Sequence, residues 1–127
     1  MAEVKPRVPT EDEEQITLFN WAAWMSNTKW PELELMYHVP NGGYRNKAEA
    51  GRFRAQGVKS GVPDIVLPVA RGGWHGLYIE LKRTEGGRVS EEQRWWLGKL
   101  NAQGYYTAVC RGWEEAKDAI EGYLQRD

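Results

Sequence analysis

Residues 61–82 read GVPDIVLPVARGGWHGLYIELK, and this stretch decides the fold. It contains two strand candidates, Asp64 to Val69 and Gly76 to Lys82, which are linked by the Gly72-Gly73 turn region. Short runs rich in β-branched and aromatic residues, bounded by glycine and proline, are typical of strands. We expect the two strands to form a hairpin, which brings Asp64 towards the end of the second strand.

The second strand carries opposite chemistry on its two faces. Successive side chains of a strand point in opposite directions, so Glu80 and Lys82 share the face opposite Ile79. A carboxylate and an ammonium in a buried strand are costly unless they are paired or serve a ligand. With Asp64 they predict a cluster of two carboxylates and a lysine. The alternative is an ion pair on the solvated face of an edge strand.

This cluster predicts metal-assisted chemistry on a phosphate. Two hard anionic oxygens suit Mg²⁺ or Mn²⁺, which keep other positions for water and phosphate oxygens. Such an ion polarises a phosphate and lowers the pKa of a bound water, while a lysine can position or deprotonate that water or offset transition-state charge. Zinc does not fit, because His38, His75 and Cys110 are the only histidines and cysteine and none shows ligand spacing.

The rest of the chain predicts helices and strands in alternation, and hence an α/β fold with a mixed central sheet flanked by helices. Two capping-box patterns, Thr10 with Glu13 and Ser90 with Gln93, each predict the start of a helix. The further expected elements are helix 11–25, strand 35–39, basic helix 47–56 stopped by Gly57, a helix from Ser90 to a stop at Gly104, strand 105–110 and helix 113–124.

The totals fit one domain. The chain has 127 residues and a formal net charge of −1, and we expect a loose arm over residues 1–9 and a single domain over residues 10–127. No apolar run approaches the roughly 20 residues of a membrane span. The N-terminus lacks a secretory pattern and Cys110 has no partner for an internal disulfide, so we expect a cytoplasmic setting.

Several motifs, taken in order, resemble one family. The chain is similar to the VRR-NUC family, the virus-type replication-repair nuclease domain of phages, bacteria and larger DNA repair enzymes, within the PD-(D/E)xK superfamily. The motifs that carry the resemblance are Thr10-Glu11 with Gln15, residues 38–43 (HVPNGG), residues 57–64 (GVKSGVPD), residues 79–82 (IELK) and residues 87–90 (GRVS) with Gln93.

The resemblance implies a restriction-endonuclease-like fold and a metal-dependent DNA endonuclease. Asp64, Glu80 and the backbone carbonyl of Leu81 would bind the divalent ion, and Lys82 would be the catalytic lysine. A first-helix glutamate would assist, either Glu11, which has Gln15 four residues on, or Glu14 one turn later. Stand-alone members of the family are similar to Holliday-junction resolvases, which implies a homodimer that cuts branched DNA.

Other residues are candidates for the site or for DNA contact, each beside a plainer alternative. Gln93 either only caps its helix or also reaches the site. The run of acids at Glu11 to Glu14 also suits the helix dipole. The residues expected to contact DNA either bind phosphates or simply form a solvated polar surface; they are His38, Asn41, Gly42, Arg45, Lys47, Arg52, Arg54, Lys59 and Ser60.

We expect the seven tryptophans to lie mostly in the core or at an interface. Trp95 and Trp96 point about 100° apart on a helix, so one of them is left exposed. An exposed tryptophan, with Trp74 or Trp113, indicates an interface and favours a twofold dimer over base stacking. Two other functions compete with the nuclease: a non-catalytic nucleic-acid-binding domain on the same fold, and a protein-interaction module.

Overall fold

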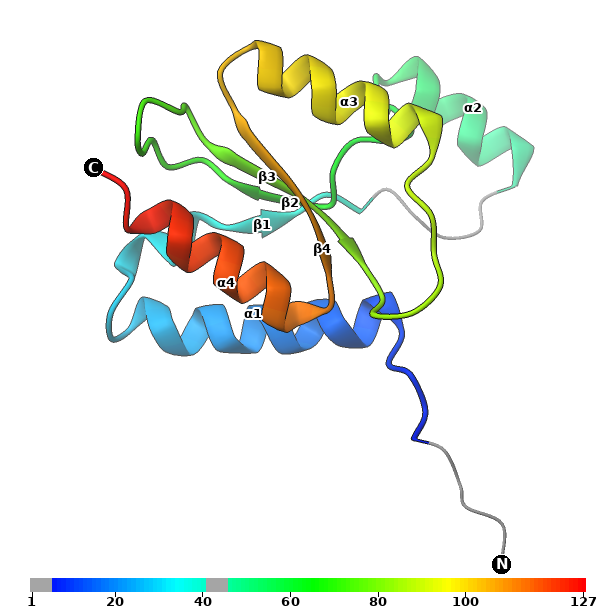
Figure 1. Cartoon of the computed structure of the whole chain (residues 1–127). Coiled ribbons are helices and arrows are strands. Elements are labelled where there is room, and N and C mark those ends of the chain that lie inside the picture. The colour runs from blue at the N-terminus through cyan, green and yellow to red at the C-terminus, as the bar shows by residue number, and fades with distance from the viewer. Residues whose placement is uncertain (1–5, 41–45) are drawn as a thin grey trace, which may run out of the picture.

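The structure is a computed structural model that describes residues 6–40 and 46–127. Figure 1 shows helices on both sides of one sheet. In chain order the elements are α1 (Glu11–Ser26), the 3₁₀ helix η1 (Pro31–Leu35), β1 (Tyr37–His38), α2 (Lys47–Ala55), β2 (Ile65–Leu67), β3 (Leu77–Lys82), α3 (Glu91–Ala102), β4 (Tyr106–Arg111) and α4 (Trp113–Leu124).

The sheet is mixed, as the sequence predicts. Its strand order is β1-β2-β3-β4, with β1–β2 and β2–β3 antiparallel and β3–β4 parallel. The predicted hairpin is therefore the β2–β3 pair. The parallel pair is joined by α3, because two parallel strands need a crossover connection. In Figure 1, α1 and α4 lie together on one side of the sheet and α3 lies on the other, with α2 beside it.

The hydrophobic core fills the space between the sheet and the α1–α4 layer. Ile79 and Leu81 point into it from β3 and are almost fully buried. Burying one such side chain contributes roughly 1.5–3 kcal/mol, so this layer supplies most of the stability. The buried residues that complete the core include Leu18, Ala22, Ile65, Leu67, Leu77, Cys110, Ala116, Ile120, Tyr123 and Leu124.

Both predicted capping boxes are confirmed. The side chain of Thr10 accepts from the backbone of Glu13, whose carboxylate accepts in return, and Ser90 and Gln93 do the same at α3. Gly57 and Gly104 follow their helices with φ of 96° each, a conformation that only glycine adopts without strain. These local signals place the helix ends within about two residues of the expected positions.

The prediction for residues 35–39 is wrong in part. Only Tyr37 and His38 form a strand, and Leu35 belongs to the 3₁₀ helix that Pro31 opens. Proline fixes φ near −65° at the first position of such a turn, and the Met36 N–H donates to the Leu33 carbonyl at 3.2 Å. The first hairpin strand also stops earlier than expected, at Leu67 rather than at Val69.

The tryptophans divide as expected on α3. Trp95 is 56% exposed, whereas Trp96 is half-buried and donates from Nε1 to the Ser60 carbonyl at 3.0 Å. Trp74 and Trp113 are partly buried and pack against the core. Trp24 on α1 is 72% exposed, which the spacing of apolar residues did not single out. Within residues 6–40 and 46–127, no helix combines the length and apolar character needed to cross a bilayer.

Candidate active site

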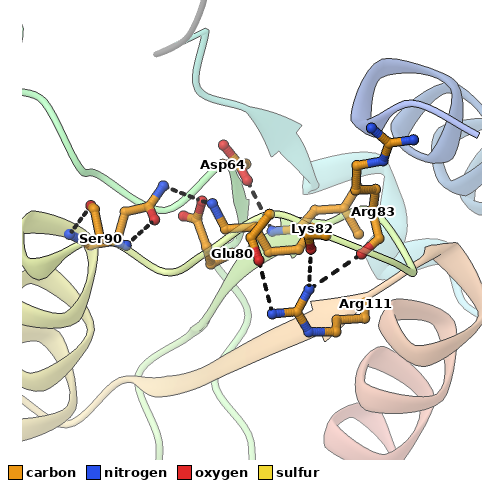
Figure 2. A network of polar contacts seen from close by, with 10 residues as sticks. Asp64, Glu80, Lys82, Arg83, Ser90 and Arg111 are labelled. Carbon is orange, nitrogen blue, oxygen red and sulfur yellow. Dashed lines mark hydrogen bonds and ion pairs between the residues drawn. The ribbon is translucent and has the colours of Figure 1, made fainter.

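Asp64 immediately precedes β2 and is held from both neighbouring strands. Its backbone carbonyl accepts from the Val39 N–H at 2.7 Å and lies 3.0 Å from Nδ1 of His38. Its side-chain Oδ2 accepts from the Leu81 N–H at 2.9 Å. The β2–β3 register, continued by one residue, places Asp64 opposite Glu80. The hairpin thus brings together residues that lie far apart in the sequence (Figure 2).

Glu80 and Lys82 share the β3 face that points away from the core, and both are buried, at 1% and 6% exposure. Nζ of Lys82 lies 3.6 Å from Oε1 of Glu80. Because β3 lies between β2 and β4, an edge-strand ion pair on a solvated face is excluded. Gln93 both caps α3 and reaches this face, since its Nε2 donates to Oε1 of Glu80 at 2.8 Å.

The electrostatics of the two carboxylates, Asp64 and Glu80, favour a bound cation. Burial first, and then the nearby charge of Asp64, raise the pKa of Glu80 to about 8. Burial also raises the pKa of Asp64, against the lowering effect of its hydrogen bond from the Leu81 N–H. Oε2 of Glu80 is buried without a hydrogen-bond partner among the described residues. An unpartnered carboxylate oxygen beside a second carboxylate fits a divalent ion, which would satisfy that oxygen and restore both charges.

A cavity of about 300 Å³ opens beside Asp64 and distinguishes the two candidate glutamates of α1. Glu11 lines it, whereas Glu14 is buried and faces the start of α4, where its Oε2 would lie only 2.9 Å from a Cβ placed on Gly112. The geometry therefore brings Glu11, and not Glu14, to the cavity. The lining residues are Glu11, Asp12, Gln15, His38, Pro40, Asp64 and Leu81.

The donor set for an ion consists of two carboxylates and backbone. Within the described part of the chain, no three His, Cys, Asp or Glu side chains form a ready metal site. The Leu81 N–H faces Asp64, while the Lys82 carbonyl accepts from Gly112 on the β4 side at 2.8 Å. Because the N–H and C=O of one strand residue point to the same side, the Leu81 carbonyl also faces Asp64. Such an all-oxygen set fits Mg²⁺ or Mn²⁺.

The chain resembles known proteins in both sequence and fold. A family model described as the VRR-NUC domain matches residues 14–114. The chain belongs to the VRR-NUC domain family. A solved structure described as a VRR_NUC domain protein has 29% sequence identity and a TM-score of 0.81, covering 94% of this chain and 91% of that one. None of the curated proteins compared with the chain matches it.

Membership in the VRR-NUC family gives the chain a nuclease-type function on an α/β nuclease-like fold. The matched range includes Asp64, Glu80, Lys82 and Gln93, and it begins three residues after Glu11. The assignment of Glu11 to the site is therefore supported by the cavity geometry and by the sequence motif, and not by the matched range.

The predicted DNA-contact residues of this VRR-NUC chain are spread over several elements. His38 lines the cavity, and its ring faces the Asp64 backbone. Ser60 is engaged within the fold, because its hydroxyl donates to Glu92 and its carbonyl accepts from Trp96. Asn41, Gly42 and Arg45 lie outside the described residues. The remaining candidates are Lys47, Arg52 and Arg54 on α2 and Lys59 in the loop after it.

Two features of the site escaped sequence reasoning. Asp12 lines the cavity beside Glu11, although the acidic run gave no reason to select it. Arg111, at the end of β4, pairs in register with Lys82 and contacts the loop after it. No local signal marks Arg111, because the partner of a parallel strand is set by the fold and not by neighbouring residues.

Proposed function

We propose that this VRR-NUC chain is a divalent-metal-dependent DNA endonuclease. The observation that carries the proposal is the meeting of Asp64, Glu80 and Lys82 on one side of a central strand, with a carboxylate oxygen left unpartnered. Buried charges of this kind cost stability, and they are retained where they serve a ligand or a reaction.

Each residue of the site has its own role in the proposed reaction. Asp64, Glu80 and the Leu81 carbonyl would hold Mg²⁺ or Mn²⁺, which when bound polarises the scissile phosphate and lowers the pKa of a coordinated water. Lys82 supplies a buried ammonium beside them, placed to hold the attacking water or to stabilise charge that builds on the phosphate. Gln93 fixes Oε1 of Glu80, and Glu11 borders the space beside Asp64.

The proposed substrate is branched DNA, as the motif resemblance implies. The proposed phosphate contacts are the cations on α2 and the loop after it, together with His38, which lines the cavity beside Asp64. Asn41, Gly42 and Arg45 belong to the same proposed contact surface through the sequence pattern alone. Such contacts give affinity and register without sequence specificity.

A homodimer is part of the proposal, and a groove of about 740 Å³ between α2 and α3 supports it. Trp95 and Val58, both exposed, lie in this groove. Arg54 and Lys59 line one side of it, and acids of the first turn of α3 line the other. A twofold axis would set the cations of one copy against the acids of its partner, as an isologous interface requires.

Arg54 and Lys59 are thus candidates for the dimer interface as well as for DNA. Sedimentation of Trp95→Asp and Lys59→Glu, beside DNA affinity measured without catalytic metal, separates the roles. An interface residue changes the sedimentation coefficient, whereas a phosphate contact weakens DNA binding and reduces its salt dependence.

Cleavage of labelled linear, flapped and four-way DNA in Mg²⁺ or Mn²⁺ tests the main proposal. We expect Asp64→Asn and Lys82→Met to lose activity by about 100- to 1,000-fold. Asp118→Asn, on the exposed face of α4, is the matched control and should cleave normally. Equal cleavage by wild type and Asp64→Asn would point to a contaminating nuclease. DNA binding without any cleavage would favour the non-catalytic alternative.

A further inference from the structure

Arg111 places its guanidinium against the loop that follows the catalytic strand. Its nitrogens donate to the carbonyls of Arg83 at 3.5 Å, Gly86 at 2.8 Å and Gly87 at 3.3 Å (Figure 2). Its own backbone N–H donates to Oε1 of Glu115 at 3.0 Å, which holds the base of the side chain. One side chain therefore binds three carbonyls of a single turn.

The turn that Arg111 binds connects two parts of the active site. Residues 83–89 form no helix or strand, and they run from Lys82 to Ser90, the N-cap of the helix that carries Gln93. Gly86 and Gly87 have φ of 75° and 68°, in the left-handed region that glycine tolerates. The position of this loop therefore affects groups at both of its ends.

The same loop also touches the site at its middle. A Cβ placed on Gly87 would lie 3.8 Å from Oε1 of Glu11 and 3.8 Å from Cδ of Lys82. Gly87 thus lies close to two residues of the proposed site. A shift of this glycine would change the space that is left to both side chains.

The chemistry of arginine suits this task. A loop without a backbone ladder loses conformational entropy when it is fixed, so it needs specific contacts to stay in place. The planar guanidinium presents five donors in a fixed fork and can satisfy several carbonyls at once, whereas a lysine ammonium is a single flexible point charge. Hydrogen bonds from a charged donor are also the stronger ones.

We propose that Arg111 is a positioning residue that fixes the 83–87 turn and thereby keeps Lys82 and Glu11 in their reactive places. It acts through these residues and contacts neither the metal nor the DNA. The inference rests on the proposed nuclease function for its kinetic test, but its structural part can be measured without cleavage.

Three variants test the proposal: Arg111→Met, Arg111→Lys and the matched control Arg71→Met. Arg71 also binds a carbonyl and a carboxylate, those of Ala70 and Glu32, but it lies in the β2–β3 connection away from the site. In single-turnover cleavage at saturating enzyme, we expect Arg111→Met to be slower by about 10- to 100-fold, because small misplacements at a site cost this much. The enzyme concentration for half-maximal rate should change less than twofold, Arg111→Lys should recover part of the rate, and Arg71→Met should match wild type.

Amide hydrogen exchange supplies the readout that does not depend on activity. Exchange of the Ser90 and Gly112 N–H groups, which donate to Gln93 and to the Lys82 carbonyl at the two ends of the turn, should be faster in Arg111→Met than in wild type and unchanged in Arg71→Met. If wild type does not cleave DNA, the nuclease proposal fails, and the exchange result still decides whether Arg111 holds the turn. Unchanged exchange would overturn the inference, and so would a normal rate in Arg111→Met. If the variant changed only the enzyme concentration for half-maximal rate, this would also overturn the inference, because it would show that Arg111 contacts DNA.

Discussion

Both faces of β3 carry buried side chains, but these side chains do opposite things. Ile79 and Leu81 point into the α1–α4 layer and pack among apolar side chains. Glu80 and Lys82 point the other way and bury charge with an incomplete set of hydrogen bonds. The first face stabilises the fold and the second weakens it. The difference teaches that burial alone does not mark a core, because the chemistry of the buried group decides whether burial stabilises.

Glu80→Gln gives the largest expected change and acts on the polar face alone. The amide keeps the shape of the side chain but removes the charge that would hold the metal, so we expect the cleavage rate to fall by about 100- to 1,000-fold. The same change removes a buried carboxylate, so the metal-free protein should unfold at a higher temperature at pH 8 than wild type. Calorimetry and single-turnover cleavage measure the two effects. A variant that loses both activity and stability would contradict the contrast between the faces.

Ile79→Ala makes the complementary change on the apolar face. Removing most of a fully buried side chain leaves a cavity and should lower the free energy of unfolding by about 2–5 kcal/mol. The cleavage rate per folded molecule should stay close to that of wild type, because the polar face is left intact. Denaturant unfolding gives the free energy of unfolding. Cleavage without denaturant, at a temperature well below the melting temperature of the variant, gives the rate. A large loss of rate in fully folded protein would show that the faces are coupled.

The pH dependence of stability sharpens the same comparison. The pKa of Glu80 is raised from 4.5 to about 8, so its contribution is fully present below pH 4.5 and is lost as the pH rises through 8. We expect the melting temperature of the metal-free protein to fall by several degrees across this window. The fall should be much smaller in Glu80→Gln.

Added Mg²⁺ should act against this trend. The ion competes with a proton for Glu80, so it should stabilise the protein more at pH 8 than at pH 6. A melting temperature that is independent of pH in the metal-free wild type would show that ionisation of the two buried carboxylates does not destabilise the fold.

The sequence predicts one face of β3 better than the surroundings of the site. Alternation along one strand separates Glu80 from Ile79, and the hairpin brings Asp64 to them, so the centre of the cluster follows from local rules. The choice between Glu11 and Glu14 does not, because both lie near one face of α1 and only the packing of α1 on the sheet separates them. The position of Arg111 beside the loop could not be predicted either, because it depends on the parallel pairing of β3 with β4, two strands that α3 separates in the sequence.

The two capping boxes extend the comparison to the smallest expected effects. They are alike locally, but Gln93 also donates to Glu80, whereas Glu13 pairs with Arg7 at the exposed start of α1. We expect Gln93→Ala to slow cleavage by about tenfold, as loss of a group that orients a metal ligand does. Glu13→Ala should leave the rate unchanged.

The stability effect of Glu13→Ala should also depend on pH in the opposite sense to that of Glu80. The hydrogen bonds from Arg7 lower the pKa of Glu13 from 4.5 to about 2, so its contribution is present above pH 4.5 and is lost as the pH falls towards 2. Both partners are exposed, so salt should screen the effect until it is hardly measurable. Thermal unfolding at pH 3 and pH 6, at low and high salt, measures it. Equal slowing of cleavage by Gln93→Ala and Glu13→Ala would mean that the caps matter only as helix ends, and that the Gln93–Glu80 hydrogen bond has no part in the reaction.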